Sequence, residues 1–308
     1  MSNSSLPIIH HHDYVSTLPR KHRFAMRKFH GVLEYLKRDQ VITMKQVHSP
    51  DEVSHETAAL VHSEEYIHKF FHGLTDAKEQ RRTGFVWDEG LARRCRLEAG
   101  GTLLSTQLAR ERGLACNTGG GTHHAFRDYG SGFCLINDMA IAAKYALKAG
   151  IVERVLIVDL DVHQGDGTAK ILENEECIFT FSMHSAKNFP FEKQKSDLDI
   201  ALEDGLGDHE YLSILHDHLP SILQSFRPDM VIYDAGVDPH VKDELGKLNL
   251  TDQGLFDRDY YVMNECIRRG IPCATVIGGG YSRDLEALSL RHTIVHRAAT
   301  KLWHSTIL

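Results

Sequence analysis

The strongest constraint on the fold is a regular alternation of short, β-branched apolar runs with longer segments of helical periodicity. The runs predict strands at Val41–Val47, Leu114–Asn117, Val155–Asp161, Cys177–Ser182, Met230–Tyr233 and Cys273–Ile277. The helical patterns cover Arg23–Arg38, Ser54–Phe71, Glu89–Glu111, Asn137–Lys148, His209–Ser225, Asp252–Arg269 and Arg283–Trp303. Strands that alternate with helices are typical of a parallel sheet. The sequence therefore predicts an α/β fold with a central parallel β-sheet flanked by helices on both faces.

Composition narrows the class of protein. The 308 residues contain no internal repeat and no low-complexity linker, so we expect a single domain over residues 1–308. The net charge of −7 is unlike the basic balance of nucleic-acid-binding proteins, so no nucleic-acid partner is expected. No apolar run approaches the roughly 20 residues that span a bilayer. The six cysteines form no CxxC pair, which is typical of free thiols in a reducing compartment and predicts a cytoplasmic protein.

Several predicted strands run directly into unusual motifs. These motifs are Gly119–His124, Asp159–His163, Ser182–His184, Asp234–Asp238 and Gly278–Tyr281. Ligands of open α/β sheets bind at the carboxyl ends of the strands, where these motifs would meet. A purely structural protein has no need of polar and glycine-rich segments at five converging strand ends. The sequence therefore predicts an enzyme site at this edge of the sheet.

The segment after the strand at Val155 has the residue types of a metal site. Asp159, Asp161 and His163 occupy alternate positions, so their side chains are expected to point to one side, and Asp238 is available from another strand end. Carboxylates and an imidazole brought together are stabilised by a cation. Three oxygen and nitrogen ligands with an open position describe a catalytic zinc site. The alternative is that the polar residues merely cap the following helix.

Two histidines and a tyrosine complete the predicted site. His123 and His124 follow three glycines, which let a backbone turn sharply or approach a ligand closely. Asp159 and Asp166 are available to orient the two imidazoles. Tyr281 follows a second run of glycines, and a phenol beside a metal can polarise a carbonyl and hold the oxyanion that forms when water attacks.

Taken together, the motifs resemble those of the zinc-dependent histone deacetylase family. In the family's order they are Gly119–Ala125, Gly132–Cys134, Asn137–Asp138, Asp159–Gly167, Ala235–Asp238 and Gly278–Tyr281. The resemblance runs from about His10 to the C-terminus and implies the arginase/deacetylase fold. The segment Arg96–Thr102, followed by Glu111–Asn117, is most similar to the class IV branch and its bacterial relatives. That branch is associated with the removal of long fatty acyl groups from lysine.

The resemblance implies two cation sites. It makes Asp161, His163 and Asp238 the zinc ligands. Asp159, Asp161, His163 and Ser182 resemble the family's monovalent-cation site, to which backbone carbonyls contribute, so a structural potassium ion is expected.

The resemblance also implies the catalytic roles. His124 would act as general base and acid, oriented by Asp166, and His123 would be paired with Asp159. Tyr281 would polarise the acyl carbonyl.

The resemblance also implies three residues that line the substrate channel leading to the site. Gly132 and Phe133 would line a narrow passage for the acyl-lysine stem, with Phe189 as the opposite wall, although both phenylalanines could be ordinary core. The chain departs from the family at Gln164, where many members have a second histidine. The rim aspartate that grips the substrate has two candidates, Asp76 and Asp88.

The expected function is that of a zinc-dependent hydrolase that removes acetyl or long-chain fatty acyl groups from lysine side chains of proteins. An acetylpolyamine or another small acylated amine is the alternative substrate, on the same chemistry. A two-manganese ureohydrolase would need more metal ligands than the sequence offers. A catalytically inactive binder of acyl-lysine is disfavoured because every residue required for chemistry is present.

Overall fold

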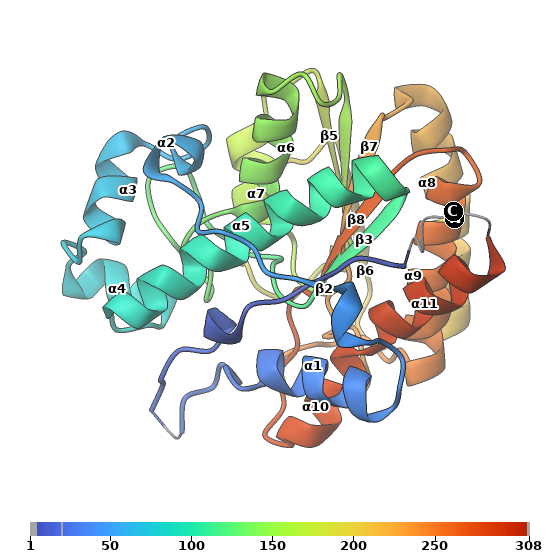
Figure 1. Cartoon of the computed structure of the whole chain (residues 1–308), viewed down its shortest axis with the longest axis horizontal. Helices are drawn as coiled ribbons and strands as arrows, with labels where there is room; N and C mark the ends of the chain where they lie inside the picture. The colour runs from blue at the N-terminus through green and yellow to red at the C-terminus, as the bar shows by residue number, and fades with distance from the viewer. Residues whose placement is uncertain (1–4, 20, 307–308) are drawn as a thin grey trace.

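The computed structural model describes residues 5–19 and 21–306 and contains one parallel sheet of eight strands among them (Figure 1). The spatial order of the strands is β2-β1-β3-β8-β7-β4-β5-β6. Their bounds are β1 Ile8–Ile9, β2 Val47–His48, β3 Leu114–Asn117, β4 Val155–Asp159, β5 Ile178–Ser185, β6 Leu198–Leu202, β7 Met230–Asp234 and β8 Cys273–Val276. Every strand pair is parallel, which confirms the predicted fold class.

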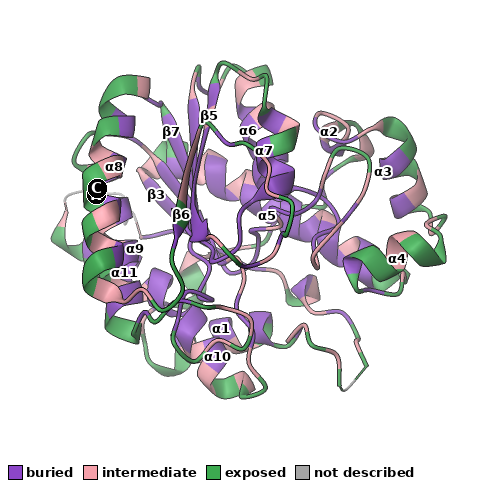
Figure 2. Cartoon of the chain, turned by 180° about the vertical axis from the view of Figure 1, so that it is seen from behind, coloured by how far each residue is buried: buried purple, intermediate pink, exposed green. Residues whose placement is uncertain are grey.

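Helices cover both faces of the sheet. Their bounds are α1 Lys28–Arg38, α2 His55–Ala58, α3 Glu64–Phe71, α4 Ala77–Thr83, α5 Glu89–Arg112, α6 Asp138–Lys148, α7 Asp166–Leu172, α8 Asp208–Phe226, α9 Asp252–Ile267, α10 Leu285–His292 and α11 Ile294–Ser305, with two 3₁₀ turns, η1 His12–Tyr14 and η2 Met44–Gln46. Helices α5, α6 and α7 lie on one face, and α8, α9 and α11 lie on the other (Figures 1 and 2). The layered arrangement buries the sheet between them.

The central strands are buried on both sides, as their sequences predict. All residues of β4 and β7 are buried, and the helices turn their exposed surfaces outward (Figure 2). Apolar side chains on both faces are expected for a strand covered by helices on each side. In the register of the sheet, Asp159 of β4 lies beside Ser182 of β5 and Asp234 of β7. The chemically unusual strand ends therefore meet at one edge.

The predicted strand at Val41–Val47 is wrong. A capping box between Thr43 and Gln46 closes the 3₁₀ turn η2, and only Val47–His48 pairs with the sheet. The side chain of Gln46 accepts a hydrogen bond from the backbone N–H of Thr43, so this local bonding replaces the strand ladder.

Several other boundaries also differ from the prediction. The first helix begins at Lys28 rather than Arg23. The pattern Ser54–Phe71 divides into α2 and α3, with Ser63 capping the second helix, and Arg283–Trp303 divides into α10 and α11. The short elements β1, β6, α4 and α7 were not among the predicted ranges. No helix in the described part of the chain is long and apolar enough to cross a membrane.

Candidate metal centre and active site

The first component of the site is the loop that joins β4 to α7. The strand ends at Asp159, two residues earlier than predicted, so Asp161 and His163 are oriented by a loop rather than by strand alternation. The carboxylate of Asp159 accepts the N–H of Asp161 at 3.1 Å, and that of Asp161 accepts the N–H of His163 at 2.8 Å. Asp238 accepts the N–H of Val162 at 2.8 Å. These backbone contacts fix the directions of the acidic side chains.

Asp161, His163 and Asp238 form a compact, buried group whose ligand atoms all lie within 4.8 Å of one another. Nδ1 of His163 lies 2.9 Å from Oδ1 of Asp161 and 3.1 Å from Oδ2 of Asp238. The backbone approaches this group closely, because a Cβ on Gly279 would lie only 2.2 Å from Oδ2 of Asp238. The Gly279 N–H donates to Oδ2 of Asp161 at 2.7 Å.

The electrostatics of this group indicate a cation. Burial and the neighbouring Asp161 raise the pKa of Asp238 to about 7. Burial alone would lower the pKa of His163, but its hydrogen bond to Asp161 and the nearby carboxylate of Asp238 raise it to about 10. Oδ2 of Asp238 accepts no well-aligned hydrogen bond from the described residues. Two carboxylates and one imidazole in a buried site suit a divalent metal such as zinc, so the residues fit the expected ion.

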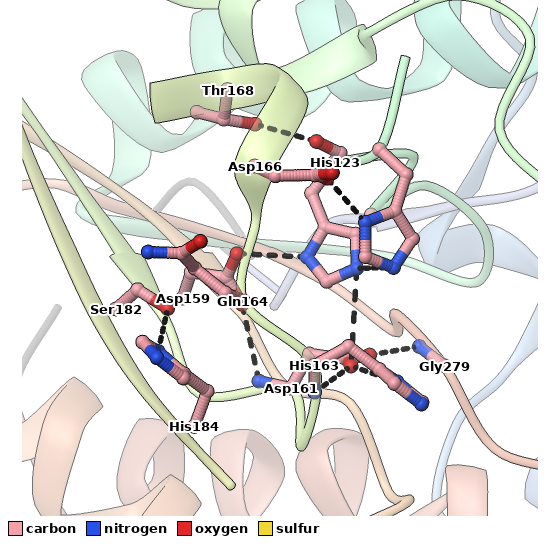
Figure 3. Close-up of polar contacts among 12 residues, drawn as sticks. His123, Asp159, Asp161, His163, Gln164, Asp166, Thr168, Ser182, His184 and Gly279 are labelled. Carbon is pink, nitrogen blue, oxygen red and sulfur yellow. Dashed lines mark hydrogen bonds and ion pairs between the residues drawn. The ribbon is translucent and has the colours of Figure 1, made fainter. Parts of the chain in front are cut away.

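Two histidine–aspartate pairs lie beside this group (Figure 3). Nδ1 of His123 is 2.8 Å from Oδ2 of Asp159, and Nδ1 of His124 is 2.6 Å from Oδ1 of Asp166. The two Nε2 atoms face each other at 3.1 Å. Both imidazoles are buried, so each carboxylate sets the orientation of its partner ring.

The two histidines differ in protonation although they are adjacent in sequence. Burial opposes a charge on His123, but Asp159 and Asp161 raise its pKa well above the usual value. Burial and the charge on His123 lower the pKa of His124 to about 4. His124 is therefore a neutral imidazole whose Nδ1–H donates to Asp166, which leaves Nε2 able to accept a proton.

Tyr281 lies next to the metal group, which is formed by Asp161, His163 and Asp238. Its N–H donates to Oδ2 of Asp243 at 2.7 Å, and its ring centre lies 6.2 Å from that of His163. Burial, followed by the charges of Asp161 and Asp238, raises the pKa of its phenol well above the usual value. The side chain therefore stays a neutral hydrogen-bond donor.

The three predicted channel residues lie around the site. The Phe189 ring centre is 4.8 Å from that of His124, and the Phe133 ring centre is 5.8 Å from that of Tyr281. Gly132 has a φ of +52°, and a Cβ there would lie 2.8 Å from both His124 and Phe189. Glycine is required where the chain passes this closely.

A small pocket of about 30 Å³ adjoins the site. Its lining includes His123, His124, Phe133, Asp161 and Tyr281, together with Phe24, Phe29, Arg94 and Glu98. The side chains of His123, His124 and Tyr281 thus line one common pocket.

Other predicted residues have partners outside the metal group. Ser182 lies beside Asp159 in the sheet, and its Oγ contacts Nδ1 of His184 at 2.9 Å. Gln164 donates to Asp199 and to the carbonyl of Gln194, both at 2.7 Å, so its amide is bound on the side of β6.

The two candidates for the rim aspartate both serve as helix caps. The side chain of Asp76 caps α4 and that of Asp88 caps α5.

Sequence analysis did not assign roles to three buried residues at the site. Asp234 is fully buried, and neither carboxylate oxygen has a hydrogen-bond partner among the described residues. Asp138 accepts the N–H groups of Gly121 and Thr122 and thereby orders the loop before the histidines. Both lie within motifs identified from the sequence. Lys28 lies outside every motif, and no local signal points to it.

The chain is similar to proteins of known family. A model of the histone deacetylase domain matches residues 22–296. An uncharacterised protein of Picosynechococcus sp. is 49% identical over 297 residues, which cover 96% of this chain and 99% of that protein. Histone deacetylase 2 of Arabidopsis thaliana is 30% identical over 276 residues, which cover 87% of this chain and 71% of that protein. The crystal structure of the HDA15 HD domain has a TM-score of 0.82 at 23% identity, covering 97% of this chain and 90% of that one, and so supports the fold.

Proposed function

The chain belongs to the histone deacetylase family, and from this premise we propose that it is a zinc-dependent hydrolase that removes acyl groups from lysine side chains of proteins. The observation that carries the proposal is the pair of buried histidine–aspartate dyads directly beside a group of two aspartates and one histidine. The raised pKa of His123 favours its protonated form and the lowered pKa of His124 favours its neutral form, which is the arrangement that combined acid and base catalysis requires.

Asp161, His163 and Asp238 would hold the zinc ion. The bound metal would supply Lewis acidity for the acyl carbonyl and lower the pKa of water in the site. We also propose a potassium ion near Asp159, Asp161, His163 and Ser182, in keeping with the family. The Oγ of Ser182 contacts Nδ1 of His184 at 2.9 Å, and a hydroxyl that donates there keeps lone pairs that could join that site.

The remaining steps fall to the chain's own side chains. Nε2 of neutral His124 would accept the proton of the attacking water, while Asp166 holds the ring in that orientation. The phenol of Tyr281 would donate a hydrogen bond to the acyl oxygen as negative charge develops there. Charged His123, 3.1 Å from His124, would keep a proton available for the leaving amine. The products would be a carboxylate and a free amine.

The substrate is tested by turnover of the zinc-loaded protein on matched compounds. A lysine peptide that carries an acetyl group is compared with the same peptide carrying a myristoyl group and with acetylputrescine. We expect hydrolysis of an acyl-lysine peptide, and a preference for myristoyl would place the chain in the class IV branch. A preference for acetylputrescine would overturn the protein substrate and favour a small-molecule amidohydrolase.

Tyr281→Phe separates the proposed catalytic role from metal binding. The metal ligands are unchanged, so the variant should keep its zinc and lose about 100- to 1,000-fold in kcat, because one oxyanion donor is removed. Zinc content is measured by elemental analysis alongside the kinetics. Loss of zinc together with activity would contradict the role. Absence of turnover in zinc-loaded wild-type protein would instead indicate an inactive binder.

A further inference from the structure

Lys28 is a buried lysine whose ammonium lies against the glycine-rich turn that precedes Tyr281. It stands at the start of α1, is 1% exposed, and lies 250 residues from the turn in sequence. Its Nζ donates to the carbonyl oxygen of Gly278 at 3.2 Å and to that of Gly280 at 3.5 Å. Helix α1 packs against α10, which follows the turn (Figure 1). The ammonium therefore contacts the backbone of the turn rather than a side chain of the metal group.

Three aromatic rings also lie near the ammonium, and the charges of Asp238, Glu98 and Arg94 act on it. Nζ lies 5.5 Å and 5.3 Å from the ring centres of Phe24 and Phe29, and 5.9 Å from that of Tyr281. Burying an ammonium is costly, and burial lowers the pKa of Lys28 to about 8. A methionine or leucine would fill the same space without that cost. The polar contacts with the two carbonyls are what distinguish a lysine here.

The two carbonyls belong to peptide groups whose opposite ends are also held. In a trans peptide the C=O and N–H point in opposite directions. The Gly278–Gly279 peptide directs its carbonyl to Lys28 and its N–H to Asp161, at 2.7 Å. The Gly280–Tyr281 peptide directs its carbonyl to Lys28 and its N–H to Asp243, also at 2.7 Å. A single ammonium thus fixes one end of two peptide planes, and two aspartates fix the other ends.

The turn needs such restraint because of its composition. Gly278 has a φ of +53° and Gly280 a φ of +156°, and glycines rotate between backbone conformations at little cost. Rotation of the Gly280–Tyr281 peptide would move the phenol relative to the metal group. A displacement of about 1 Å at a reacting group can cost about 100-fold in rate.

We propose that Lys28 is a positioning residue for Tyr281: by binding the carbonyls of Gly278 and Gly280 it fixes the turn that directs the phenol toward the acyl oxygen. This inference rests on the proposed function for its kinetic consequence, but the order of the turn can be measured without any substrate. The hydrogen bonds of Lys28 go to the carbonyls of the turn and not to the proposed zinc ligands. Its contribution should therefore act through Tyr281.

The first test measures the turn directly in the full chain. Hydrogen–deuterium exchange of a peptide covering residues 278–282 is compared among wild type, Lys28→Met and a control, Lys144→Met. Lys144 pairs with Glu175 on the surface, away from the turn. We expect faster exchange in Lys28→Met alone. If that variant does not fold, Lys28→Gln, which cannot reach both carbonyls as lysine does, is measured in the same way. Unchanged exchange in the folded variant would overturn the proposal.

The second test is a double-mutant cycle with Tyr281→Phe. Lys28→Met should keep its zinc and lose about 10- to 100-fold in kcat, with KM changed by less than about threefold, because the damage is to orientation rather than binding. In the Tyr281→Phe background the same substitution should cost less than about threefold. Fully additive losses would overturn the positioning role. Inactivity of wild type on every acyl substrate would remove the proposed function, and the exchange experiment would still decide the role of Lys28.

Discussion

Two buried clusters of charge lie close together in this protein, and they are balanced in opposite ways. The first is the pair Arg258–Asp259 of α9, in which both side chains are fully buried and the guanidinium lies 2.8 Å from the carboxylate. Tyr233 donates a hydrogen bond to the same carboxylate at 2.6 Å. The second is the acidic edge of the sheet, where Asp161, Asp234 and Asp238 are buried with fewer cationic partners than carboxylates.

The difference separates a structural cluster from a functional one. Arg258 and Asp259 neutralise each other, and the arginine also donates to the carbonyls of Leu160 and Gly236 at 3.1 and 2.8 Å. These carbonyls lie next to the segments that carry the proposed metal ligands. At the acidic edge, burial followed by the neighbouring carboxylates raises the pKa values of Asp234 and Asp238, and neither oxygen of Asp234 has a hydrogen-bond partner among the described residues, so the folded chain alone does not balance the charge of these groups. A bound cation would supply the missing balance.

The largest effect is expected from Asp238→Asn, which removes one carboxylate from the acidic edge. Zinc affinity and activity should both fall by more than about 100-fold, because a proposed ligand is lost. In metal-free protein the same change should increase the free energy of unfolding at pH 8, because the raised pKa of Asp238 means that its ionised form destabilises the fold. Elemental analysis and urea unfolding in a chelator measure the two effects. A metal-free variant clearly less stable than metal-free wild type would contradict this account.

Arg258→Met should have the opposite effect on stability. It leaves Asp259 buried without its cation and deprives two carbonyls of a donor, so the free energy of unfolding should fall by about 3–5 kcal/mol. Urea unfolding of metal-free protein measures the change. The matched control is the double variant Arg258→Met/Asp259→Leu, which removes both charges and should recover much of the loss. If the double variant is as unstable as the single one, packing rather than charge balance explains the effect.

The position of the acidic edge could be predicted from sequence because it depends on local patterns. Buried strands can be recognised in the sequence as short apolar runs. Because the carboxyl ends of parallel strands lie at the same edge of a sheet, motifs that follow such runs, such as Asp159–His163 and Asp234–Asp238, are expected at that edge. The roles of individual histidines came from family resemblance, since a pairing such as His124 with Asp166 joins residues 42 positions apart. Strand periodicity predicts that the histidines and aspartates lie near one another, but it does not predict which histidine binds which aspartate.

Three features were beyond sequence patterns for physical reasons. The contact of Lys28 with Gly278 depends on how α1 packs, which no local periodicity encodes. The orientation of Asp161 follows from loop hydrogen bonds after the strand has ended, not from strand alternation. The segment Val41–Val47 resembles a strand in sequence, but the side chains of Thr43 and Gln46 form local hydrogen bonds with the backbone that take the place of strand pairing.

The smallest effect concerns His62, which shows how a buried imidazole behaves without carboxylates around it. Its Nδ1 lies 2.9 Å from the carbonyl oxygen of Phe126, and its Nε2 accepts the N–H of Asn137 at 2.8 Å. Burial lowers its pKa to about 4, whereas the pKa of His163 among carboxylates is raised to about 10. A buried histidine thus changes its charge state according to whether carboxylates or backbone groups surround it.

The consequence for stability follows from the lowered pKa of His62. Unfolded His62 binds a proton near pH 6.5 and folded His62 only near pH 4, so its stabilisation is complete above pH 6.5 and is lost as the pH falls toward 4. Between pH 7.5 and pH 5 this amounts to about 2 kcal/mol. Urea unfolding of metal-free wild type and His62→Gln at both pH values isolates the contribution of His62 to the free energy of unfolding, since the other histidines are common to both proteins. On acidification from pH 7.5 to pH 5, the free energy of unfolding of His62→Gln should fall by about 2 kcal/mol less than that of wild type. Equal losses in the two proteins would mean that His62 is not the neutral, backbone-bound group that distinguishes it from the histidines of the acidic edge.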